Sequence, residues 1–351
     1  MSSVESRKVQ VGAGGSYLLV LPKDWARRVG LKRGDRLDVL VEEDGSLRVL
    51  PPSARKAALR QAELSLEDVS GPQWLDRSIK AAYMQGCDVI SIVSKDRIPP
   101  DLKKTIRSTT LDLVGMEIAD VQHDRMVLRI LVDPAKFPLR ELRERAFSLL
   151  LSMIRDLIAS LEKGEKGYAY DVIDREAEVT KLYRLMIRQS MLAIRDRDIA
   201  KAIGVERLED NITNVMMARD LLQLTFLNIR LARSVLSLND KVPSNVSEPI
   251  LEMFKSVYNM VEKVFRAAST NDLADAHSVI DQMERIRAMD SEIMRDLLHA
   301  PVDIETALTL IMIVRDIRRM AGCAVAIADS IITGATPSKP SVAQQPQPAH
   351  R

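Results

Sequence analysis

The chain has 351 residues, 46% of them hydrophobic and 28% charged, a composition typical of a globular protein with two or three domains. Its formal net charge of +2 excludes a general attraction to polyanions, so a nucleic-acid role would need a local cationic patch. Two distant cysteines exclude a disulfide framework, and the lack of a cleavable leader or a long apolar run predicts a cytoplasmic protein without membrane insertion.

The first fifty residues predict a small strand-rich module. In chain order we expect a strand at 7–11, a turn at 12–15, a strand at 16–22, a short helix at 23–30, a strand after the Gly34-Asp35 turn, a hairpin turn at 44–45 and a last strand to Pro51. A module of this size buries little apolar surface alone, and its strands alternate apolar and polar residues. We therefore expect a second copy to complete a barrel, which makes the protein a homodimer.

Basic side chains gather in the same module. They are Arg7, Lys8, Lys23, Arg27, Arg28, Lys32, Arg33 and Arg36, against few acidic residues before Glu42. A two-fold dimer would double this patch, and neutralisation of phosphates by lysine and arginine drives DNA binding. The alternative is a solvated surface that serves only solubility.

The segment "VGAGGSYLLVLPKDWARRVGLKRGDRLDVLVEEDGSLRVLPP" resembles a SpoVT/AbrB-type swapped-hairpin domain over about residues 4–52. The resemblance implies an interlocked dimeric β-barrel (AbrB-like) in residues 1–52 whose basic side chains meet DNA. The predicted DNA-binding residues are Arg7, Lys8, Lys23, Arg27, Arg28 and Arg33. The first turn departs from the pattern, because it carries extra glycine and serine where many members have a shorter polar turn.

Residues 53–137 predict a small α/β linker domain. After a linker with a local helix or strand, we expect a helix at 74–85, a buried strand at 87–94, a helix at 99–113 and two strands within 116–133. The two strands would turn at His123-Asp124. Gly86 and Gly115 are isolated, so no glycine-rich phosphate loop is predicted.

From Pro138 the pattern becomes helical and repeats itself. Apolar spacing predicts helices at 138–163, 167–197, 199–238, 246–269, 271–299 and 302–333, with one break near Ile203-Gly204. "YDVIDREAEVTKLYRLMIRQS" at 170–190 echoes "HSVIDQMERIRAMDSEIMRDL" at 277–297, which predicts two similar three-helix bundles within 138–334. The proline- and glutamine-rich residues 335–351 predict a disordered tail. The fold class is thus multidomain and mostly α.

The helical repeat resembles the PhoU family of phosphate-uptake regulators. In that family the third helices carry a Glu/Asp-x-x-x-Asp motif that binds metal clusters, and "ERLED" places Glu206 and Asp210 at those positions. Two carboxylates one helical turn apart repel each other unless a cation lies between them. Asp174 of the middle helix could add a third ligand, with Asp171 and Glu178 spaced on the same face. Oxygen ligands of this kind suit a divalent metal or iron. The alternative is a solvated acidic stripe.

The second repeat argues for a weakened metal site. Arg318 and Gly322 stand at the positions that we relate to Glu206 and Asp210, and neither ligates a cation. Arg318 and Arg319 could meet an anion, although an ion pair with Asp316 or with a neighbouring helix is the simpler expectation. Cys323, within a run of small residues, is expected to serve packing. We predict no cofactor other than this one possible metal.

Three functions remain open at this stage. The first is a dimeric, phosphate-responsive transcription regulator that binds promoter DNA through the N-terminal module. The second is a cytoplasmic adaptor that regulates a phosphate transporter ATPase or a sensor kinase without binding DNA. The third, an enzyme, lacks a nucleophile with its base at recognisable spacing, so we predict that the protein is not an enzyme.

Overall fold

The computed structural model describes residues 6–12, 14–41, 45–51, 59–207, 209–238 and 242–335. These residues fall into two compact units that are divided between Leu59 and Arg60. The predicted tail lies outside the described residues except for Ala335, as does the linker segment 53–58. Each unit is described by itself.

The N-terminal module consists of two hairpins and one short helix. β1 (Gln10–Val11) pairs antiparallel with β2 (Tyr17–Leu18), α1 spans Lys23–Arg28, and β3 (Asp38–Val41) pairs antiparallel with β4 (Leu47–Leu50). The predicted elements are present, but the strands are shorter than their sequence patterns. Among the described residues each hairpin is a separate two-stranded sheet, so one chain closes no barrel there.

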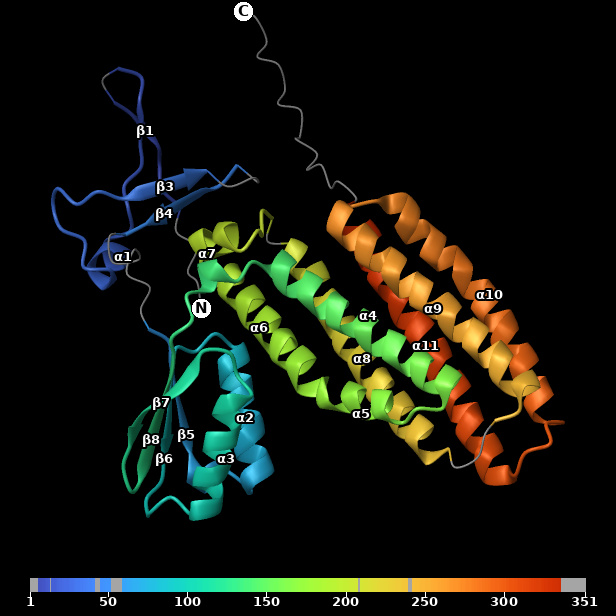
Figure 1. Ribbon diagram of the computed structural model, residues 1–351. Helices are drawn as coiled ribbons and strands as arrows, with labels where there is room; N and C mark the ends of the chain where they lie inside the picture. The colour runs from blue at the N-terminus through green and yellow to red at the C-terminus, as the bar shows by residue number, and fades with distance from the viewer. Residues whose placement is uncertain are drawn as a thin grey trace, which may run out of the picture. The chain divides into compact units, whose positions relative to one another are not determined.

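The α/β unit, Gln61–Lys136, is a four-stranded mixed sheet with two helices on one face (Figure 1). Its strands β5 (Gln61–Ser65), β6 (Val89–Val93), β7 (Met116–Val121) and β8 (Arg125–Ile130) lie in the order β5-β6-β8-β7. The helices are α2 (Pro72–Met84) and α3 (Pro100–Leu111), and short 3₁₀ helices span Leu66–Asp68 and Pro134–Lys136.

The sheet interior follows the alternation of its strands. Ile90, Ile92, Met126 and Leu128 are fully buried, as expected when every second side chain faces the covering helices. β5 runs parallel to β6, and α2 makes the crossover between them. The sequence left β5 within an undecided linker because its short polar pattern, QAELS, is typical of an edge strand rather than a buried one.

The helical region contains two repeats that pack as one body (Figure 1). In the first repeat the second and third predicted helices are each divided, so it consists of α4 (Leu139–Lys163), α5 (Gly167–Asp174), α6 (Glu176–Arg195), α7 (Arg197–Ala202) and α8 (Asp210–Ser237). The second consists of α9 (Ser244–Thr270), α10 (Leu273–Leu297) and α11 (Ile304–Ala335). The third helices of the two repeats, α8 and α11, pack along each other, and α4 packs on α9.

Two of the predicted helices are divided. The helix expected at 167–197 breaks at Arg175, whose guanidinium donates to Asp156 and Ser152 of α4. The helix expected at 199–238 stops at Ala202, because Gly204 takes φ +81° and the Val205 amide bonds back to the Ala200 carbonyl at 2.8 Å. The predicted break at Ile203-Gly204 is therefore confirmed, but the helix resumes only at Asp210.

A buried arginine joins the α/β unit to the first repeat. Arg188 of α6 is 3% exposed, donates to the carbonyls of Tyr83 and Cys87, and pairs with Asp88 at 2.9 Å. Its guanidinium also lies 5.1 Å from the centre of the Tyr83 ring. Since a buried charge is tolerated only when it is paired and hydrogen-bonded, these contacts fix α6 against the end of α2.

In the part of the chain that the structure describes, no helix has the length and apolar character required to cross a membrane.

Candidate functional site

The structure places all six predicted DNA-binding residues on the surface of the N-terminal module. They are Arg7 and Lys8 before β1, Lys23, Arg27 and Arg28 on α1, and Arg33 in the following turn. Lys23 and Arg27 are four residues apart on α1 and therefore share a face. Arg33 lies in a tight turn in which the Lys32 amide donates to the Asp35 carboxylate at 2.7 Å. The carboxylate of Asp35, one of the few acidic residues of the module, is therefore bound to the backbone of the same turn.

The same module leaves its apolar strand residues in solvent. Val11 is 71% and Tyr17 77% exposed, and Val9, Leu18, Val39 and Val41 are also exposed. No described residue of residues 6–51 is buried. Isolated two-stranded hairpins are marginal in water, and contiguous exposed apolar surface marks an interaction site. A single chain of this module therefore exposes both apolar strand residues and basic side chains.

The three predicted metal ligands are not brought together. Glu206 lies in the connection before α8, so it does not share a helix with Asp210, the first residue of α8. Asp174 ends α5, and the whole of α6, about 30 Å at 1.5 Å per residue, separates it from α7 and the start of α8. Within the described ranges there is no group of three histidine, cysteine or acidic residues that could hold a metal ion.

Asp210 is paired with an arginine of its own chain. Its carboxylate accepts two bonds from the Arg207 guanidinium, at 2.7 and 3.2 Å, and Arg207 also donates to the Gly334 carbonyl at the end of α11. Beside this pair, Val205 is buried and Ile212 is exposed. A divalent metal or iron at this place stays a prediction, which elemental analysis of the purified protein tests.

Both third helices carry buried apolar residues at helical spacing. They include Leu221, Leu224 and Leu231 of α8 and Ile317, Met320 and Ile327 of α11. An Arg-Asp pair precedes the first of these residues in each helix, in "ARDLLQL" at 218–224 and in "VRDIRRM" at 314–320. The relation of Arg318 and Gly322 to Glu206 and Asp210 stays a prediction.

The Arg-Asp pairs of the two third helices, Arg219-Asp220 and Arg315-Asp316, have different surroundings. Asp316 of α11 is buried and accepts from Arg230 at 2.5 Å and Arg319 at 3.3 Å. Burial raises the pKa of Asp316, and the two arginines act in the opposite direction. Burial likewise raises the pKa of Asp220, where only Arg219 opposes it. The sequence signal for these carboxylates is an Arg-Asp pair followed by an apolar residue in each third helix.

A second buried carboxylate lies beside the first. Asp290 of α10 accepts from Arg315 at 3.0 Å and from Arg318 at 3.3 Å, both through Oδ2, while its buried Oδ1 has no partner among the described residues. The expected ion pairs of Arg318 and Arg319 are thus present. Cys323 is buried one turn further along α11, and burial raises the pKa of its thiol to about 12, in agreement with its expected packing role.

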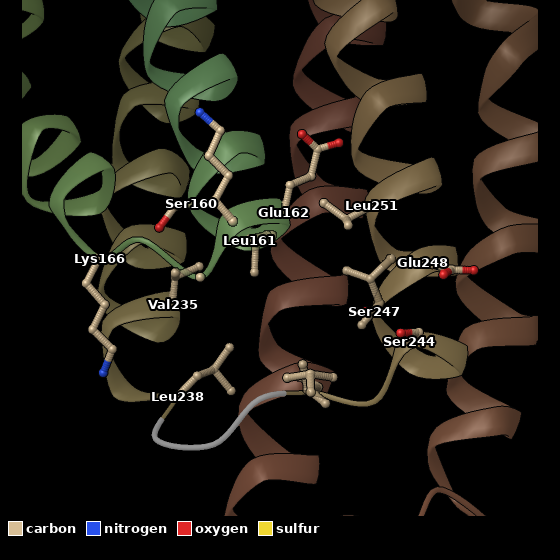
Figure 2. Close-up of a pocket in the computed structure, with 15 residues that line it drawn as sticks. Ser160, Leu161, Glu162, Lys166, Val235, Leu238, Ser244, Ser247, Glu248 and Leu251 are labelled. Atoms are coloured by element: carbon tan, nitrogen blue, oxygen red, sulfur yellow. The ribbon is translucent and has the colours of Figure 1, made fainter.

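A pocket of about 680 Å³ opens where the two repeats meet, at the end opposite to Asp210 (Figure 2). Leu161, Val235, Leu238 and Leu251 form apolar parts of its wall. Two of the charged residues that line it have protein partners. Lys166 donates to the Leu236 carbonyl at 2.9 Å within the first repeat, and Glu162 of α4 pairs with Lys255 of α9 across the two repeats.

Comparison with known proteins identifies two regions of the chain. Residues 144–224 and 250–331 match the PhoU domain, and residues 12–57 match the family described as antidote-toxin recognition MazE, bacterial antitoxin. No curated protein sequence matches the chain significantly. The predicted resemblances to PhoU and to an AbrB-like N-terminal domain are confirmed.

Two solved structures resemble the helical region. The crystal structure of the phosphate transport system regulatory protein PhoU from Streptococcus pneumoniae is 15% identical, with a TM-score of 0.49 over 56% of this chain and 93% of that one. PhoU from Pseudomonas aeruginosa is 16% identical, with a TM-score of 0.44 over 56% of this chain and 94% of that one. The assignment rests on the domain matches, which suggest phosphate-uptake regulation and hint at DNA binding.

Proposed function

We propose that this chain, which contains a PhoU domain in two repeats behind a MazE/AbrB-like N-terminal domain, is a dimeric transcription regulator that responds to phosphate. The N-terminal module binds promoter DNA, and the helical repeats sense phosphate status or dock a partner that does. The four parts of the chain are residues 1–52, 53–137, 138–334 and 335–351.

The observation that carries this proposal is the pairing of two features in one small module. Its strands bear exposed valine, leucine and tyrosine side chains with no buried residue in the described part, and all six predicted DNA-binding residues are exposed on its surface. A second copy would cover the apolar strands, and the same association would double the cationic surface. Phosphate contacts of this kind supply most of the affinity of a protein for DNA.

The direct test is DNA binding by the full chain at several salt concentrations. Fluorescence anisotropy with a duplex from the upstream region of its own gene is expected to show binding that weakens steeply as salt rises. Arg27→Ala with Arg28→Ala should lower the affinity about tenfold or more and flatten the salt dependence. Arg140→Ala with Arg145→Ala on α4 is a matched control of equal charge change, and it should leave binding unchanged.

The second candidate is an adaptor that regulates a phosphate transporter or a sensor kinase. In that case the N-terminal module only dimerises, and the arginine pair on α1 makes no contribution to DNA affinity. Equal, weak and sequence-independent binding by the wild type and the Arg27/Arg28 variant would therefore refute DNA regulation and favour the adaptor. Light scattering on the same samples reports whether the chain is a dimer in both.

A further inference from the structure

Four arginines form a cluster on the solvent side of α8, α10 and α11. The arginine cluster consists of Arg230 of α8 and Arg315, Arg318 and Arg319 of α11. Two carboxylates lie beneath it: Asp316 holds Arg230 and Arg319, and Asp290 holds Arg315 and Arg318. Both carboxylates are at most 5% exposed, whereas the arginine side chains are 39% to 60% exposed. The acids therefore act as an inner layer and the guanidinium groups as an outer one.

The two buried carboxylates orient the four arginines but bind only part of their N–H donors. Each arginine uses a single nitrogen in these contacts: Nη2 of Arg230 and Nη1 of Arg315, Arg318 and Arg319. A guanidinium carries five N–H donors, so most donors of the cluster are left for a ligand. Because the carboxylates already hold the side chains, an incoming anion would lose less binding energy to ordering them.

The charges of the cluster do not balance. Four guanidinium groups stand over two carboxylates, which leaves a surplus of two positive charges when both acids are ionised. The three members on α11 fall within residues 315–319, a rise of about 6 Å along the helix. Planar guanidinium forks at such spacing match the oxygens of a doubly charged tetrahedral anion, for which arginine is the preferred side chain.

A glycine leaves the cluster uncovered. Gly322 lies in the interior of α11, where glycine costs about 1 kcal/mol relative to alanine. A Cβ added at this position would meet no atom within 4 Å. A helical side chain covers the surface over the turn that precedes its own Cα, which for residue 322 is the turn of Arg318 and Arg319. The glycine therefore keeps open the space above two of the four arginines.

We propose that the arginine cluster is a binding site for a tetrahedral oxyanion, and that its ligand is free orthophosphate. This inference rests on the proposed function, because it makes phosphate itself the signal that the helical repeats detect. The ligand lies over the turn of Arg318 and Arg319, and the donors that the two buried carboxylates leave free bind its oxygens.

The test measures orthophosphate binding to the full chain by equilibrium dialysis with labelled phosphate at constant ionic strength. The wild type should bind saturably at or below about 1 mM, and sodium chloride at equal ionic strength should not compete. Gly322→Glu should weaken binding about tenfold or more, because it places a carboxylate in the open space above the arginines. The variant should fold, since the position is helical and unobstructed.

The matched control is Gly167→Glu, which adds the same side chain to the first residue of α5, where a Cβ also meets nothing within 4 Å. It should bind phosphate like the wild type. A second variant, Arg318→Gln with Arg319→Gln, leaves one arginine on each buried carboxylate and should weaken binding to a similar degree. Circular dichroism confirms that each variant is folded.

Absence of saturable binding to the wild type up to about 10 mM phosphate would overturn the inference. So would equal binding by the wild type and the folded Arg318/Arg319 variant, or equal loss in Gly167→Glu and Gly322→Glu. None of these measurements contains DNA. A failure here therefore leaves the DNA-binding proposal intact, and a failure of DNA binding leaves the phosphate result to be judged by itself.

Discussion

The N-terminal module and the helical repeats treat the same kind of side chain in opposite ways. In the repeats, three apolar side chains are fully buried: Phe147 on α4, and Phe254 and Val264 on α9. In the module, Val11, Tyr17 and Val41 are equally apolar and are more than two thirds exposed. In the repeats, the burial of apolar side chains within one chain offsets the conformational entropy lost on folding. The module buries too little apolar surface within one chain to do the same.

The difference teaches where each region obtains its stability. A helix of 25 to 32 residues carries an apolar stripe long enough to be covered by other helices of its own chain. Strands of two to four residues cannot cover one another within a single copy. The repeats should therefore behave as an autonomous body, and the module should depend on association. Four substitutions would break or sharpen this contrast.

The largest change in the free energy of unfolding is expected for a substitution in the interior of the repeats. Phe254→Ala removes a fully buried ring from α9 and should lower the free energy of unfolding by about 3–5 kcal/mol. Leu308→Ala on the exposed side of α11 is the control and should change it by less than about 0.5 kcal/mol. Urea denaturation followed by circular dichroism at 222 nm measures both. Equal, small losses would mean that the repeats have no tightly packed interior.

The next effect concerns the junction of α6 with the α/β unit. Arg188→Ala leaves the carbonyls of Tyr83 and Cys87 without their donor and should cost about 2–4 kcal/mol. Hydrogen exchange should rise in α2 and β6 and stay unchanged in α10, which is far from the junction. Uniform loss of protection in all helices would show instead that the α/β unit and the repeats unfold together.

A smaller effect depends on pH. Asp220 is half-buried, and burial raises its pKa above the ordinary value of 3.8. The folded state then binds a proton more tightly than the unfolded state, so stability from this group falls as the pH rises from about 4 through the folded pKa. Asp220→Asn should remove this slope and add about 0.5 kcal/mol at neutral pH. Parallel wild-type and variant curves of unfolding free energy against pH would contradict it.

The smallest effect on unfolding belongs to the module. Leu18→Asp changes an exposed residue of β2 and should alter helix unfolding by less than about 0.5 kcal/mol. The same change should abolish the dimer, because a second copy would have to bury the added carboxylate. Light scattering measures the assembly, with Leu308→Asp on α11 as the control for an exposed leucine elsewhere. An unchanged dimer would place the association outside the strands of the module.

Much of the fold followed from periodicity, because the helices of the repeats are long and amphipathic. The predicted starts and ends of α4, α9, α10 and α11 fall within a few residues of the observed ones. The strand β5 was left undecided because its partner β6 is distant in sequence, and parallel pairing leaves no local turn signal. The division at Arg175 depends on a contact with Asp156 of another helix, which no local pattern contains.

The candidate sites were predictable to different degrees. Surface position of the basic residues in the module followed from composition alone, since charged side chains are seldom buried. We predicted that Glu206 and Asp210 share one helix face because they are four residues apart. However, α7 ends before Gly204 and α8 begins only at Asp210, so Glu206 lies in the connection between the two helices. Asp290 and Arg230 could not be placed beside Arg318 and Arg319, since only tertiary packing brings α10 and α8 to α11.

The junction at Arg188 makes the two repeats unequal in what they can transmit. The side-chain hydrogen bonds described above between the α/β unit and the helices come from α6, a helix of the first repeat. A displacement that begins in the second repeat can enter the first repeat through the α8–α11 contact or through the α4–α9 contact. Both α8 and α4 pack on α6, so α6 can pass either input to the sheet through its side-chain hydrogen bonds.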